Sequence, residues 1–261
     1  MLDWTRSMHQ LHLEEQILVA SQIVVLAALC ARMWWGGLYK IYACFFGYLV
    51  VELLQMLVPV FVPLNSRMYR DSYVVSQALV ICFSALVVLE LYSIVLRGLP
   101  GIGNVSRRYI KVTLALAILV ALLPLALEKA PNTLTGYLFV FQRPIISSLV
   151  VFILLILAFL VYYPVPLGRN ALVYLMGYAA YFITNATTGL IRNLGHYWTR
   201  PLSDANMVVY VVCLLFWLLA LNSEGETRSV VAGHQWNPSD EGRLLVQLEA
   251  INASLLRSAR K

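Results

Sequence analysis

The residue with the clearest chemical potential in this sequence is Glu52, a carboxylic acid in the middle of a long apolar segment. Tyr48 and Gln55 lie about one helical turn before and after it, so a helix would carry all three on one face. An ionisable side chain at bilayer depth costs a few kcal/mol and commonly marks a site. We therefore interpret Glu52 as a proton acceptor or as a group that orients a ligand in a central cavity.

A second polar stripe lies on a later apolar segment. Its members are Tyr174, Tyr178, Tyr181, Asn185 and Thr188. Their alternating spacing of four and three places them on one helix face. If the two segments run antiparallel, Glu52 and Asn185 lie at similar depth, which predicts a polar seam between them. The alternative is that Glu52 is protonated or hydrogen-bonded and only holds helices together. From the sequence, this structural role is weighed slightly ahead of the functional one.

Two further groups of ionisable residues receive plainer interpretations. Glu90 and Arg97 are about 10 Å apart along a helix, which predicts a salt bridge near the inner membrane surface. His9, His12 and His196, with nearby acids, offer ligands of the kind that Zn²⁺ prefers. Such histidine spacing is common by chance, so no metal site is expected.

The sequence argues against cofactor chemistry in the apolar segments. The last of them has no lysine, so it cannot form a retinal Schiff base. All four histidines lie outside these segments, which excludes haem held inside a helix bundle. No nucleophile–base pair is evident. We therefore predict no catalytic residues, no cofactor, no nucleic-acid partner and no enzymatic activity.

The amino-acid composition indicates the class of protein in which these residues lie. Hydrophobic residues make up 61% of the 261 and charged residues only 12%, with a net charge of +6. A soluble domain carries roughly 25% charged residues, and the mean hydropathy here is +0.76. These values exclude a water-soluble fold and predict an integral membrane protein.

Seven segments approach the ~20 apolar residues that a transmembrane helix needs. They are 16–35, 38–62, 72–96, 109–127, 144–165, 171–191 and 205–222. The predicted fold is an all-α seven-transmembrane-helix bundle over 16–222, preceded by an interfacial segment at 1–15. A polar linker at 223–238, expected to be irregular, leads to a tail at 239–261.

The two sides of the membrane hold seven Lys and Arg each before the tail, which adds five to its own side, and the densest cluster, in the third loop, lies on that side as well. By the positive-inside rule, this favours an outside N-terminus and an inside C-terminus. The possible glycosylation sites at Asn104, Asn185 and Asn252 all fall away from the predicted outer face. This arrangement favours a bacterial inner membrane.

The tail predicts a short amphipathic helix. Its apolar face would hold Leu244, Leu248, Ile251 and Leu255, and its basic end Arg257 and Arg260. Such a helix can lie on an anionic membrane surface, pair as a short coiled coil, or dock into a groove. The membrane surface is the default interpretation, and the near-equal mixture of acids and bases on the polar side is an argument for a protein contact.

Three functions fit these features. The first is a receptor-like sensor, without enzymatic activity, that signals through a partner protein. The second is an accessory or structural subunit of a larger membrane complex. The third is a small transporter that uses Glu52 for proton coupling. The lack of internal repeats and of broken helices counts against transport, which ranks third. The sensor ranks slightly above the subunit. Ligand and oligomeric state are not encoded in any pattern that we find.

Overall fold

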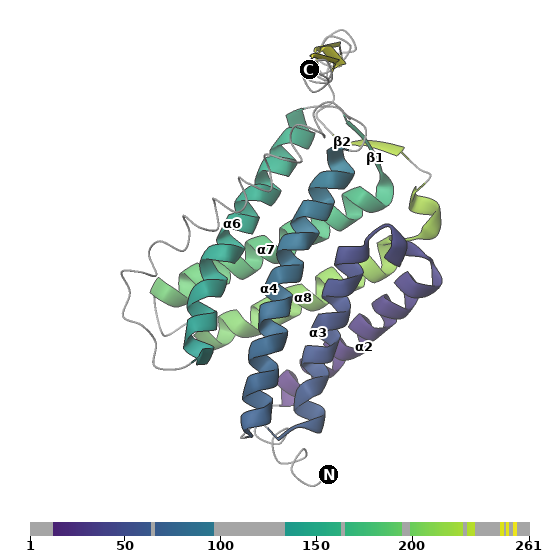
Figure 1. Ribbon diagram of the computed structural model, residues 1–261. Helices are drawn as coiled ribbons and strands as arrows, with labels where there is room; N and C mark the ends of the chain where they lie inside the picture. Colours follow the sequence, from purple (N-terminus) through teal and green to yellow (C-terminus); the bar gives the residue numbers. More distant parts are fainter. Residues whose placement is uncertain are drawn as a thin grey trace.

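The described part of the chain is almost entirely helical in the computed structural model (Figure 1). The structure describes residues 13–63, 66–96, 134–162, 165–194, 199–226 and 229–232, together with positions 246, 247, 249, 250, 253 and 254. Within these ranges there are six α-helices. They are α2 (Leu13–Trp35), α3 (Ala43–Phe61), α4 (Arg67–Val95), α6 (Leu134–Tyr162), α7 (Arg169–Leu194) and α8 (Thr199–Ala220).

Six of the seven expected spans coincide with these helices, and the fourth, 109–127, lies outside the described residues. The span expected at 38–62 was wrong at its start. Gly37 adopts a positive φ of 70°, which favours glycine, and the 3-10 turn η1 (Leu38–Lys40) follows it. Helix α3 therefore begins only at Ala43. Helix α6 begins ten residues before the expected 144 and carries Pro144 within it.

Three of the described helices contain segments long and apolar enough to cross a membrane: Ile17–Trp35, Arg67–Val95 and Pro144–Tyr162. Two shorter apolar helical segments, Ala43–Pro59 and Asp204–Ala220, accompany them. The outer surface is apolar as well, since Leu54, Leu155 and Leu219 are 58%, 61% and 75% exposed. These features indicate a membrane protein.

The six helices form a closed ring in the order α2, α3, α4, α6, α7, α8, with α8 returning to α2. Large aromatic side chains fill its interior. Phe45, Tyr174, Tyr178 and Trp217 are each fully buried, and their rings lie 4.6–5.6 Å apart in successive pairs. This aromatic core fixes α3, α7 and α8 relative to one another.

A small sheet lies at one end of the ring, which we call the sheet end (Figure 1). Strand β1 (Val165–Gly168) pairs antiparallel with β2 (Ser229–Ala232), and Val165 lies opposite Ala232. Helices α3 and α7 begin at this end, and α4 and α8 end there. The expectation of an irregular linker at 223–238 was wrong for β2, because Val230 and Val231 favour extended backbone and find a partner strand in β1.

The tail is helical at 246, 247, 249, 250, 253 and 254. The residues proposed to dock it, Leu244, Leu248, Ile251, Leu255, Arg257 and Arg260, all lie outside the described residues. The histidines His9, His12 and His196 also lie outside them.

Candidate functional site

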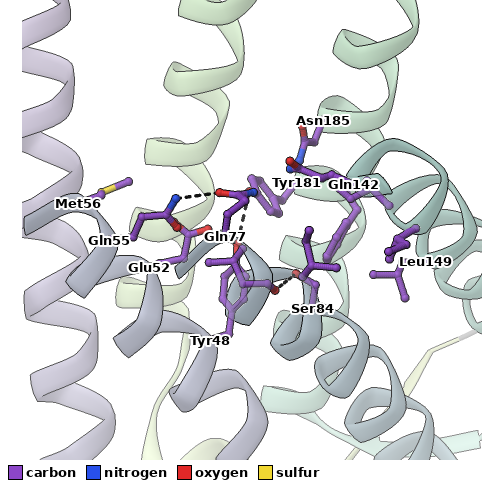
Figure 2. A pocket seen from close by; sticks show the side chains of 15 residues that line it. Tyr48, Glu52, Gln55, Met56, Gln77, Ser84, Gln142, Leu149, Tyr181 and Asn185 are labelled. Atoms are coloured by element: carbon purple, nitrogen blue, oxygen red, sulfur yellow. Dashed lines mark hydrogen bonds between the residues drawn. The ribbon is translucent and has the colours of Figure 1, made fainter. Parts of the chain in front are cut away.

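A polar cavity lies inside the ring, between α3, α4, α6 and α7 (Figure 2). Its volume is about 200 Å³, below the roughly 300–1,000 Å³ of sites for drug-sized ligands. Its polar lining residues are Tyr48, Glu52, Gln55, Gln77, Ser84, Gln142, Tyr181 and Asn185. The cavity therefore has room for a small polar solute and offers it hydrogen-bonding groups from four helices.

Glu52 is held in place by its own helix. The hydroxyl of Tyr48, one turn earlier on α3, donates a 2.8 Å hydrogen bond to Glu52 Oε1. The Tyr181 hydroxyl of α7 lies 3.4 Å from that of Tyr48, which brings the two polar stripes together. Within the described part of the chain, no donor reaches Glu52 Oε2. One carboxylate oxygen is thus fixed by Tyr48, and the second is left for a partner in the cavity.

The other lining side chains differ in how far their hydrogen bonds are satisfied. Gln55 donates a 2.8 Å bond to Gln77 and so joins α3 to α4. Ser84 donates to the carbonyl of Val80 in its own helix, at 2.7 Å. Gln142 Oε1, in contrast, is buried without a donor in the described structure. A buried acceptor without a donor costs roughly 1–3 kcal/mol, so a bound donor would stabilise this wall of the cavity.

The structure separates the residues of the predicted seam into two groups. Tyr48, Glu52, Gln55, Tyr181 and Asn185 line the cavity. Tyr174 and Tyr178 do not line it, because they belong to the aromatic core nearer the sheet end. The Tyr178 ring packs 5.8 Å from that of Tyr48, and its hydroxyl is buried without a partner among the described residues.

Three polar lining residues, Gln77, Ser84 and Gln142, were missed by the sequence analysis. Gln77 and Ser84 are seven residues apart on α4, so their shared helix face was a readable signal. Gln142 lies ahead of the span expected at 144–165, and nothing in the sequence connects it with Glu52.

Glu90 has a role that the sequence did not indicate. Its carboxylate accepts hydrogen bonds from the backbone N–H groups of Cys44 and Phe45, at 2.9 and 3.1 Å, and from the Tyr174 hydroxyl at 3.2 Å. The first N–H groups of a helix have no intrahelical acceptor and carry partial positive charge. Glu90 of α4 therefore caps the start of α3. Its expected partner Arg97 lies outside the described residues.

A third carboxylate fastens the segment after α8 to the bundle. Glu226, in the 3-10 turn η5 (Ser223–Glu226), accepts hydrogen bonds from the Tyr42 hydroxyl at 2.6 Å and from Asn170 Nδ2 at 3.0 Å. Asn170 Nδ2 also donates to the Asn222 carbonyl at 2.7 Å, and Asn222 N–H donates back to Asn170 Oδ1 at 3.3 Å. We call Tyr42, Asn170, Asn222 and Glu226 the sheet-end clasp. It ties the chain that leaves α8 to the starts of α3 and α7.

The clasp predicts the effect of Gly225→Ala. A Cβ atom at Gly225 would overlap the Asn170 side chain, which is fully buried and cannot move aside freely. We expect Asn170 to lose its bonds to Asn222 and Glu226, at a local cost of roughly 1–3 kcal/mol. Amide hydrogen exchange at 221–232 should therefore become faster. Gly168→Ala is the matched control, since its Cβ would make only ordinary contacts near 3.8 Å. Equal exchange in both variants would contradict the proposed clasp.

The described residues contain no group of three His, Cys, Asp or Glu side chains that could hold a metal ion. No family model, curated protein or solved structure matches the chain, so its site has to be interpreted from its own geometry.

Proposed function

We propose that this chain is a seven-helix protein of the bacterial inner membrane, with its C-terminus inside, that acts as a sensor. A small polar ligand would bind in the cavity around Glu52, and the response would pass through the sheet end to a partner protein that contacts the tail. The observation that carries this proposal is the cavity itself, lined by polar groups from four helices of an otherwise apolar bundle.

Two helices connect the cavity with the sheet-end clasp. Helix α3 carries Glu52 at the cavity. Tyr42, immediately before α3 and about 15 Å from Glu52 along the helix axis, donates a hydrogen bond to Glu226. Helix α7 carries Tyr181 at the cavity and Asn170 in the clasp. Helices transmit small displacements well when both their ends are fixed by packing and hydrogen bonds. A shift of α3 or α7 on ligand binding would therefore act on the segment after α8.

The test uses the full chain in lipid nanodiscs with a panel of small polar compounds that are cationic, neutral or anionic. At least one compound should raise the unfolding temperature and change hydrogen exchange at 221–232. Asn170→Leu should keep ligand binding and lose most of the exchange response, because Asn170 lies in the clasp and not in the cavity. Binding that leaves 221–232 unchanged in the unmodified chain would contradict the sensor.

A proton-coupled transporter is the second candidate, and the observation that favours it is a carboxylate in a polar cavity with one oxygen that receives no hydrogen bond from the described residues. It predicts proton flux in liposomes that is lost in Glu52→Gln. The sensor predicts no flux in either protein, so one assay separates the two functions.

A further inference from the structure

We infer that the ligand of the cavity is a small protonated organic amine whose ammonium group binds Glu52. This inference rests on the proposed function, since it names the chemical class of the molecule that the sensor would detect. Three independent features of the cavity support it: its charge, its unsatisfied acceptors and its aromatic wall.

The charge of the cavity is one-sided. Among the fifteen described residues that line it, Glu52 is the only acidic one, and none is Lys, Arg or His. The described salt bridge nearest in sequence, between Arg70 and Asp71, is a surface contact whose side chains are 61% and 72% exposed. A carboxylate in apolar surroundings is costly unless it is protonated or a cation accompanies it. A cationic ligand supplies that charge, whereas an anionic ligand would be repelled.

The cavity has acceptors that are open to a donor, although the amides of Gln77, Gln142 and Asn185 also bring donors of their own. Glu52 Oε2 faces no donor in the described structure, and Gln142 Oε1 is a buried acceptor without a partner. The donors of Tyr48 and Ser84 are already used within the protein. An ammonium group has three donors and no acceptor. It can therefore satisfy Glu52 and still donate to a neighbouring amide oxygen of the lining.

The wall beside Glu52 is aromatic. Tyr48, Tyr181 and Phe182 all line the cavity, and the rings of Tyr181 and Phe182 lie 5.4 Å apart. Aromatic faces attract organic cations, by about 2 kcal/mol when the cation is desolvated. A bare metal ion would prefer more oxygen ligands than one carboxylate and a few amides supply. The volume of about 200 Å³ limits the amine to a small one.

The experiment measures binding to the full chain in nanodiscs, in phosphate buffer without other amines. The probes are the chlorides of methylammonium and ethanolamine, which are the two amines, the chloride of choline, which carries the charge without an N–H donor, the neutral analogue ethylene glycol, and sodium glycolate. Sodium and potassium chloride at equal ionic strength show whether a bare cation is sufficient. Binding is followed by the shift in unfolding temperature and by hydrogen exchange over α3 and α4.

At least one of the amines should bind, and Glu52→Gln should weaken that binding at least tenfold. Glu52→Asp keeps the charge and should retain part of the binding, which guards against a folding defect in the glutamine variant. Asp71→Asn removes an exposed carboxylate from α4 and should bind as the unmodified chain does.

The outcomes distinguish the two proposals. Binding of ethylene glycol or glycolate without any amine would overturn the amine assignment and leave the sensor standing. An equal effect of sodium or potassium chloride, or unchanged amine binding in Glu52→Gln, would overturn the amine assignment at Glu52. If no probe of any class binds, both this inference and the proposed sensor fail.

Discussion

Replacing Gly177 with valine should destabilise the bundle by about 3 kcal/mol, at the upper end of the range typical of overpacked cores. Gly177 lies on α7 where Trp217 of α8 crosses it, and even a Cβ atom there would overlap the indole ring. Trp217 is fully buried and packs 5.0 Å from Phe45 and 5.1 Å from Tyr178, so it has no space into which to turn. Small residues allow close helix approach of this kind in membrane proteins. The valine should therefore push α7 and α8 apart.

The measurement is thermal or denaturant unfolding of the purified chain in detergent, with Ala180→Val as the matched control. Ala180 lies on the exposed side of the same helix, so its valine variant introduces the same side chain without the overlap. Helix propensity alone would make Ala180→Val the more costly change, because valine is a poorer helix former than alanine and a better one than glycine. Adding Trp217→Leu to Gly177→Val should recover part of the loss, because it removes the ring that the valine meets. Equal stability of Gly177→Val and Ala180→Val would show that this contact does not limit the packing.

The sequence predicts the helices of this fold well because apolar runs of about 20 residues have few alternatives to a helix. The nearly all-helical architecture is confirmed for the described residues. The error at 38–62 has a local cause. Gly36 and Gly37 end the preceding helix, and Leu38–Lys40 then forms one 3-10 turn. The single charge at Lys40 does not outweigh the apolar residues that follow, so hydropathy alone does not register the turn.

The candidate site was predictable only within each helix. Spacing places Tyr48, Glu52 and Gln55 on one face, and the structure brings that face to the cavity. Residue spacing predicts the helix face on which a side chain lies, but not which residues of the neighbouring helices lie at the same level. The stripe on α7 therefore divides between the cavity, which Tyr181 reaches, and the aromatic core, where Tyr174 lies.

The role of Glu90 was beyond sequence reasoning for a different reason. The partners expected for a carboxylate are basic side chains, and Arg97 is the obvious one in its neighbourhood. The partners that the structure gives it are two backbone N–H groups of another helix, and backbone groups leave no mark on the sequence. Glu90 therefore offers the sharpest test of how the start of α3 is held.

Replacing Glu90 with leucine should destabilise the protein by about 3 kcal/mol or more. The change leaves the N–H groups of Cys44 and Phe45 and the Tyr174 hydroxyl without their acceptor. Each orphaned donor costs roughly 1–3 kcal/mol when it stays buried. Glu90→Gln keeps one acceptor oxygen but introduces a donor amide among donors, so its stability should fall between those of the leucine variant and the unmodified chain. Unfolding in detergent measures the order.

Tyr174→Phe is the matched control, since it removes one of the three donors and leaves both backbone bonds to Glu90 in place. It should cost less than either change at Glu90. The order unmodified chain, Tyr174→Phe, Glu90→Gln, Glu90→Leu would identify the carboxylate as a cap for α3. An equally stable Glu90→Leu would mean that α3 begins without help from α4. The link that we propose between Glu52 and the sheet end would then depend on Tyr42 and Glu226 alone.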